Sequence, residues 1–129
     1  MKYHSLNYNS HNVSFLDAVR KGLAPDRGLY FPEKIPKLSE KFIQNINSYS
    51  NHEIAFEVIN PFVGNEISKN RLREIIADTL IFDFPIVSIN DKIATLELFH
   101  GPTLAFKDVG ARFMARCLNY ANEIKSNKN

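Results

Sequence analysis

A single stretch late in the chain, residues 98–114, most constrains what the chain can fold into. Its sequence, LFHGPTLAFKDVGARFM, ends an apolar run that covers 93–99, turns at Gly101 and Pro102, and then takes up helical spacing. Proline is tolerated in the first turn of a helix, and threonine can cap one. The stretch therefore predicts a strand, a tight turn and a helix that begins at about Thr103.

The helix predicted after this turn runs from about Leu104 to Ala121. Apolar residues cover much of its circumference, and such a helix needs cover on most of its sides. The tail that follows is polar, although a parallel unit needs a strand on both sides of its helix. On this ground we expect the sequence to be the first part of a longer chain. If it folds alone, the uncovered helix is expected to drive self-association or to bind a partner.

Helical spacing dominates the chain before residue 82, and short strand-like apolar runs follow. We therefore expect an α/β fold of mixed α+β character in two domains: a small helix-rich amino-terminal domain, 1–88, and the first strand and helix of a second domain, 89–129. The elements expected, in order, are a weak strand within 3–8, a helix capped by Ser14 and closed by Gly22, a strand at 29–31, a helix capped by Ser39, a helix from 52 to 59 that ends before Pro61, a helix from 67 or 68 to 80, and strands at 84–89 and 93–99.

Composition and charge exclude several classes of function. The 129 residues are 44% hydrophobic, which suits one modest core and argues against disorder. The net charge of +2 is too small to indicate nucleic acid or an anionic membrane as a partner. Basic residues on the helix predicted at 67–80 form either an anion site or, as is more common, a solvated face; they are Lys69, Arg71 and Arg73.

The sequence also lacks the signals of secretion and of membrane insertion. The first residues, MKYHSLNYNS, lack the apolar run of a secretion signal, and the sequence contains no run of about 18 apolar residues. The single cysteine, Cys117, can form no internal disulfide and joins no cluster with metal-ligand spacing. We expect a cytoplasmic protein without a metal site.

Lys107 is the residue at which the sequence places the most reactive chemistry. Leu104, Ala105 and Phe106 precede it, and it lies near the positive end of the predicted helix. Desolvation and the helix dipole both disfavour the ammonium form of a lysine in such a place. The neutral amine is the form that attacks a carbonyl, as lysines that form Schiff bases do. The residues alone favour a more ordinary interpretation, a lysine that keeps its charge in water or pairs with an acid.

Other polar residues near Lys107 have structural interpretations beside the catalytic ones. Asp108 lies one helical turn before Arg112, which is the spacing of an ordinary ion pair. His100 can act as an acid or a base, but beside a glycine–proline turn it is more often a structural hydrogen bonder. Cys117 is expected to be a core thiol, because no cationic neighbour favours its thiolate.

Two separated parts of the sequence carry a family resemblance. LFHGPTLAFKD and the following VGARFMAR resemble the cofactor-lysine segment of the threonine synthases, which are pyridoxal-phosphate enzymes of fold type II. VSFLDAVRKGLAPDRGLYFPEKIP, from residue 13, and FVGNEI, from residue 62, resemble the amino-terminal segments of the same family. The matches keep their order over most of the chain. One departure is Arg27, because some relatives carry Asp-Gly-Gly-Leu where this chain has DRGL.

The resemblance implies a function for Lys107. In this family the matching lysine carries pyridoxal 5'-phosphate, and the enzyme converts O-phospho-L-homoserine and water to L-threonine and phosphate. The resemblance also implies that Phe106 and Asp108 shape the surroundings of the cofactor. Residues 89–129 would then begin a fold-type II cofactor domain, whose remainder is the partner of this chain.

The phosphate-binding part of such a site is missing from the sequence. No glycine-rich loop occurs among the 129 residues, so no backbone cradle for a phosphate is expected. We therefore expect the chain by itself to be inactive. Two alternatives remain: a free-standing, non-catalytic module that binds a partner or itself through its last helix, and another fold-type II enzyme that acts on a related amino acid.

Overall fold

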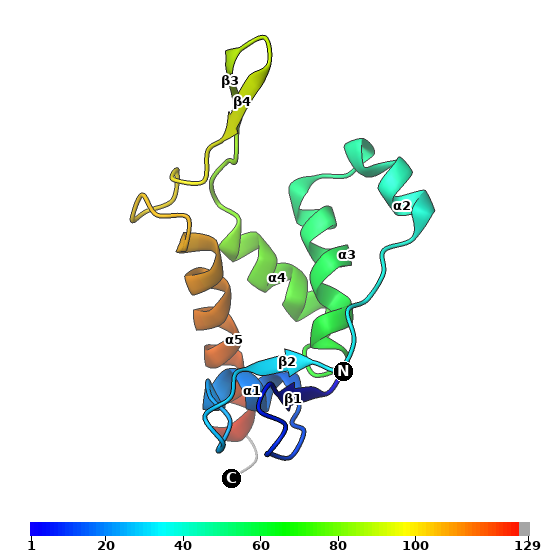
Figure 1. Cartoon of the computed structure of the whole chain (residues 1–129), viewed down its shortest axis with the longest axis vertical. Helices are drawn as coiled ribbons and strands as arrows, with labels where there is room; N and C mark the ends of the chain where they lie inside the picture. The colour runs from blue at the N-terminus through cyan, green and yellow to red at the C-terminus, as the bar shows by residue number, and fades with distance from the viewer. Residues whose placement is uncertain (127–129) are drawn as a thin grey trace.

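The computed structural model describes residues 1–126, and within them helices alternate with two small sheets (Figure 1). This mixed α/β architecture confirms the predicted fold class. The elements in order are β1 (Tyr3–Ser5), α1 (Phe15–Lys21), β2 (Tyr30–Pro32), α2 (Glu40–Gln44), the short 3-10 helix η1 (Ile46–Ser48), α3 (Asn51–Val63), α4 (Lys69–Thr79), β3 (Ile86–Asn90), β4 (Ile93–Leu96) and α5 (Asp108–Ser126).

Four of the helices begin after a serine whose hydroxyl accepts a hydrogen bond from the backbone N–H three residues on. These serines are Ser14, Ser39, Ser50 and Ser68. Such caps stabilise a helix by about 1 kcal/mol each, because they satisfy N–H groups that have no partner within the helix. The predicted caps at Ser14 and Ser39 are confirmed. A second acceptor at the start of α1 lies far away in the sequence: the carboxylate of Glu66 accepts the N–H groups of Phe15 and Leu16 at 2.8 and 3.0 Å.

The prediction that a helix ends before Pro61 is wrong. α3 continues to Val63, and Pro61 lies in its last turn. Proline removes only one backbone hydrogen bond there, and the turn still closes, because the N–H of Gly64 donates to the carbonyl of Asn60 at 3.0 Å. The continuation also brings Val63 into the core, where it has no exposed surface.

The first sheet pairs β1 and β2 antiparallel, with His4 opposite Phe31. The turn before β2 is held by Asp26, whose carboxylate accepts hydrogen bonds from the hydroxyl of Ser5 at 2.6 Å and from the N–H groups of Asn9 and Gly28. Arg27 takes a left-handed backbone conformation with φ 66°, which a residue with a Cβ adopts only at some cost. The turn in which the sequence departs from some relatives is therefore a strained one.

The core lies between α1, α3, α4 and α5. Leu72 and Ile76 of α4 are buried there together with Ile67, and α5 contributes Cys117 and Ala121, neither of which is exposed. Cys117 is thus a core thiol, as predicted, and burial raises its pKa to about 11. α5 is covered on the side that faces α1 and α4, whereas Met114, also in α5, is 56% exposed.

The second sheet is an antiparallel hairpin of β3 and β4 that projects away from the helices (Figure 1). Its turn is closed by Asn90, whose side-chain oxygen accepts the N–H groups of Lys92 and Ile93. The second strand is predicted to reach Phe99, but β4 ends at Leu96. The ladder stops opposite Pro85, because proline accepts the N–H of Glu97 but has none to return.

Candidate functional site

Lys107 lies immediately before α5, and its carbonyl accepts the N–H of Ala111 at 2.9 Å. The predicted place near a helix start is therefore confirmed, although the helix begins at Asp108 and extends to Ser126 where the sequence predicts 104–121. The side chain of Lys107 is exposed, as are those of Leu104 and Phe106. The described residues thus supply the positive end of a helix but not the apolar surroundings that the sequence predicts.

The segment before the helix is a closed loop, residues 101–108. Both carboxylate oxygens of Asp108 bind Thr103: Oδ1 accepts its hydroxyl at 2.5 Å, and Oδ2 accepts its backbone N–H at 2.9 Å. Between them the chain turns through Leu104, at φ 59°, whose N–H donates to the carbonyl of Gly101. The prediction that Thr103 caps the helix is wrong, because its hydroxyl is taken by Asp108 and the left-handed residue delays the helix.

The carboxylate of Asp108 is buried beside an exposed lysine. The residue is 7% exposed, and the hydroxyl of Thr103, followed by its N–H, holds the pKa of Asp108 below its ordinary value. Gly101 makes this burial possible, since a Cβ on Gly101 would lie 2.3 Å from Oδ2 of Asp108 and 2.7 Å from its Cβ. The loop therefore requires glycine for reasons of space.

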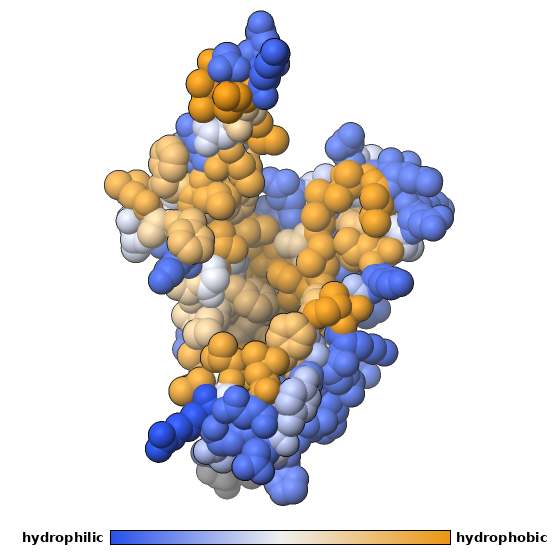
Figure 2. Space-filling view, viewed as in Figure 1, coloured by the Kyte–Doolittle hydropathy of each residue, from blue (hydrophilic) through white to orange (hydrophobic). Residues whose placement is uncertain are grey.

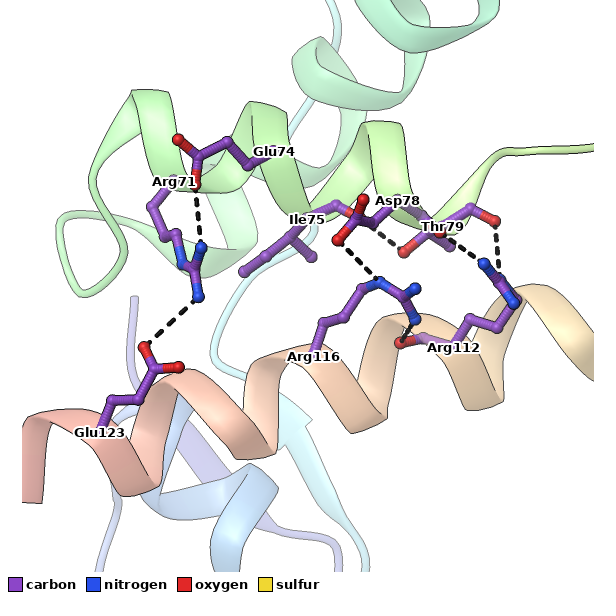
Figure 3. A network of polar contacts seen from close by, with 8 residues as sticks. All are labelled: Arg71, Glu74, Ile75, Asp78, Thr79, Arg112, Arg116 and Glu123. Atoms are coloured by element: carbon purple, nitrogen blue, oxygen red, sulfur yellow. Dashed lines mark hydrogen bonds and ion pairs between the residues drawn. The ribbon is translucent and has the colours of Figure 1, made fainter.

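The predicted pair of Asp108 with Arg112 is not formed. Arg112 donates instead to the carbonyls of Asp78 and Thr79, at the end of α4, at 2.7 and 3.3 Å. Arg116, one turn further along α5, lies 3.5 Å from the carboxylate of Asp78 (Figure 3). Cations are favoured at the negative end of a helix, so both arginines fasten α5 to the carboxyl end of α4. The charge of Arg112 still contributes to the lowered pKa of Asp108.

The remaining polar candidates have structural partners. Nε2 of His100 lies 2.7 Å from Oε2 of Glu97, which agrees with the interpretation of His100 as a hydrogen bonder. In the basic cluster, Arg71 forms ion pairs with Glu74 and Glu123 at 2.9 and 3.3 Å (Figure 3), and Arg73 lies 4.3 Å from the centre of the Phe56 ring. Arg71 and Arg73 therefore contact neighbouring side chains, and Lys69 is exposed, as on a solvated helix face.

Exposed apolar side chains lie on the hairpin and in the loop that carries Lys107. Figure 2 shows apolar side chains gathered on the hairpin and across a hollow in the middle of this face. We define the hairpin–loop patch by its exposed apolar residues, which are Ile86, Val87, Ile89, Ile93, Leu96, Leu98, Phe99, Leu104 and Phe106. Many exposed apolar side chains in one region mark a place where something else packs.

The chemistry at Lys107 fits one part of a cofactor site. An exposed amine at the end of a loop can reach an aldehyde carbon, as a covalently held cofactor requires. Around it, residues 1–126 offer no glycine-rich cradle for a phosphate, and the carboxylate of Asp108, the first residue of α5, is bound to Thr103. In the same range, no group of three His, Cys, Asp or Glu residues could hold a metal ion, and no helix is both long and apolar enough to span a bilayer.

The fold and the loop together define the class of this chain. It is a helix-rich α/β unit in which a lysine-bearing loop precedes the last helix. The family model described as "Threonine synthase N terminus" matches residues 2–80. The chain is 39% identical over 127 residues to threonine synthase of Buchnera aphidicola subsp. Baizongia pistaciae, covering 98% of this chain and 30% of that protein. It is 37% identical over 120 residues to threonine synthase of Escherichia coli (strain K12), covering 93% of this chain and 28% of that protein.

Solved structures of threonine synthases have the same fold as this chain. The crystal structure of threonine synthase from Escherichia coli matches with a TM-score of 0.89 and 36% identity, over 95% of this chain and 28% of that chain. The structure of PLP-bound threonine synthase from Brucella melitensis matches with a TM-score of 0.92 and 35% identity, over 98% of this chain and 28% of that chain. The chain belongs to the threonine synthase family. It spans less than a third of the length of these relatives, which lend no support to a non-catalytic module.

Proposed function

We propose that this chain forms the amino-terminal part of a pyridoxal-phosphate-dependent threonine synthase, which converts O-phospho-L-homoserine and water to L-threonine and phosphate. The observation that carries the proposal is the match of more than nine-tenths of the chain to threonine synthases at 37–39% identity. A PLP-bound relative with the same fold supports the choice of cofactor.

Lys107 is proposed to hold pyridoxal phosphate covalently through its amine. When bound, this cofactor draws electrons from the amino acid and so eases the loss of protons from its α and β carbons. The amine of Lys107, once released, would carry those protons. Its exposure and its place before α5 support the role, because nothing among the described residues covers it. Phe106, which is 68% exposed, and Asp108 are proposed to shape the space beside the cofactor.

The remainder of the cofactor domain is the proposed partner. It would supply the phosphate site that residues 1–126 lack, and it would cover the hairpin–loop patch. The domain division at 88/89 remains part of the proposal, although this position lies within β3 and α5 packs against α1 and α4. A cytoplasmic location also belongs to it, and the buried free thiol of Cys117 suits a reducing compartment. Without that remainder, the 129-residue chain is expected to be inactive and to self-associate through the exposed side of its last helix, α5, together with the hairpin–loop patch.

The test uses the product of the complete reading frame. The protein is incubated with pyridoxal phosphate, reduced with borohydride and digested, and the modified peptide is identified by mass. A pyridoxyl group on Lys107 is expected, and Lys107→Ala should abolish both the label and phosphate release from O-phospho-L-homoserine. Lys69→Ala is the matched control, since Lys69 is also exposed at the start of a helix. Phosphate release by Lys107→Ala would overturn the role of the lysine, and release by the 129-residue chain would overturn its expected inactivity.

A further inference from the structure

The loop at 101–108 is built around a contact that does not involve Lys107. Asp108 uses both carboxylate oxygens on one residue, Thr103, with bonds of 2.5 and 2.9 Å that close the six-residue segment 103–108. A carboxylate that accepts two hydrogen bonds from the same residue fixes both the distance and the direction of the turn. We name Thr103 and Asp108 together the Asp108 clamp.

The Asp108 side of the clamp is buried, whereas Thr103 and most of the residues that the clamp encloses are exposed. Asp108 is 7% exposed, whereas Leu104 and Phe106 are 74% and 68% exposed. Gly101 closes the clamp from the other side, where a Cβ would collide with Asp108. The loop is thus shaped from within, and its outward residues are left available.

The surroundings of Asp108 argue against two other roles for its carboxylate, an ion pair with Arg112 and direct binding of the cofactor. The carboxylate forms no ion pair with Arg112, which is engaged by α4. Its two oxygens point to Thr103, within the loop, so they are occupied before any cofactor binds. A side chain so engaged acts on the shape of the loop, and through the loop on its neighbour Lys107.

We propose that Asp108 is a positioning residue: the Asp108 clamp holds the loop so that the amine of Lys107 is presented in one place to pyridoxal phosphate. The inference rests on the proposed function of Lys107. A misplacement of about 1 Å can cost on the order of a hundredfold in rate, so loss of the clamp slows capture of the cofactor by Lys107 without removing the lysine.

Substitutions at the clamp separate shape from charge. Asp108→Ala removes both bonds. Asp108→Asn keeps the geometry without the charge, because the amide oxygen can accept the N–H of Thr103 and the amide nitrogen can donate to its hydroxyl. Thr103→Val removes only the hydrogen bond that the hydroxyl donates to Asp108, and Thr103→Ser keeps that bond.

The experiment uses the product of the complete reading frame and two readouts. The first is hydrogen exchange of the peptide that covers 101–108, followed by mass spectrometry. The second is the rate at which Lys107 acquires a pyridoxyl group, trapped by borohydride at successive times. Asp108→Ala should speed the exchange and slow the capture by about tenfold or more. Asp108→Asn and Thr103→Ser should stay within about threefold of the unaltered protein, with Thr103→Val between these limits.

Several results would overturn the inference. Capture at the unaltered rate in both Asp108→Ala and Thr103→Val would remove the positioning role. Impairment of Asp108→Asn as deep as that of Asp108→Ala would assign the effect to charge. If Asp108→Ala fails to fold, Thr103→Val carries the comparison. If the unaltered protein gains no pyridoxyl group on Lys107, the proposed function fails. Unchanged hydrogen exchange in Thr103→Val would separately show that the clamp does not hold the loop.

Discussion

The guanidinium of Arg112 donates to the backbone carbonyl of Asp78 at 2.7 Å, although the two residues are 34 positions apart. The same side chain reaches the carbonyl of Thr79 at 3.3 Å. The last carbonyls of a helix have no partner within it, and they carry its negative end. Arg112 therefore joins the carboxyl end of α4 to the first turns of the helix that follows Lys107.

Replacing Arg112 with methionine keeps most of the side-chain stem and removes every donor. We expect the free energy of unfolding to fall by about 1–2 kcal/mol, because hydrogen bonds to charged groups are lost and two carbonyls regain only water. Urea unfolding followed by circular dichroism measures the change. Lys34→Met is the control, since Lys34 is exposed between β2 and α2, and an equal loss in both variants would contradict the contact.

Gly101 and Gly110 provide a matched pair of glycines on either side of Lys107. A Cβ on Gly101 would lie 2.3 Å from Oδ2 of Asp108, whereas a Cβ on Gly110, within α5, would meet nothing within 4 Å. Gly101→Ala should lower the free energy of unfolding by about 1–3 kcal/mol through overpacking. Gly110→Ala should raise it by about 0.5–1 kcal/mol, because alanine is the better helix former. Thermal unfolding of both variants tests the opposite signs, and a shift of the same sign in both would refute the close approach.

Local chemistry accounts for the elements that the sequence predicts well. Ser14 and Ser39 are identifiable as caps because each directly precedes a segment with helical spacing, and the hydrogen bond that each accepts comes from three residues on. The two hairpin strands were recognisable as apolar runs separated by a turn at Asn90. The lysine loop was recognisable too, because its glycine and proline are turn residues whatever surrounds them.

Contacts between distant residues account for the errors. Thr103 has the right composition for a helix cap, but Asp108 takes its hydroxyl, and Leu104 adopts a left-handed conformation that no propensity favours. Arg112 has an acid one turn away, but the carbonyls of α4 take its guanidinium. The apolar neighbours of Lys107 are exposed because burial depends on what packs against a segment, and the segment does not encode that.

Asp26 should make the stability of the first sheet depend on pH. The hydroxyl of Ser5, followed by the N–H groups of Gly28 and Asn9, holds the pKa of Asp26 below its ordinary value of 3.8. Such a carboxyl stabilises the folded chain at pH above the ordinary value, and the contribution is lost as the pH falls toward and through the lowered one. Asp26→Asn should therefore cost more stability at neutral pH than at about pH 3.

The control for Asp26 is Asp91→Asn, in the exposed turn of the hairpin. Urea unfolding of both variants and of the unaltered chain at the two pH values gives the comparison. A cost of Asp26→Asn that is the same at both pH values would show that the carboxylate is not the group that the turn binds.

Cys117 should make the stability of the chain depend on pH in the alkaline range, with the opposite sign to Asp26. It is fully buried in the core, and burial raises its pKa from the ordinary 9.0 to about 11. A raised pKa favours the protonated thiol in the folded chain, so its contribution to stability is complete below pH 9 and is lost as the pH rises toward 11.

At pH 8 the thiol of Cys117 should react with an aromatic disulfide only when the chain opens, so the rate of labelling should rise in parallel with unfolding by urea. Cys117→Ala should show a shallower decline of stability between pH 9 and 11 than the unaltered chain. Rapid labelling of the folded chain at pH 8, or an identical decline in the variant, would place the thiol outside the core.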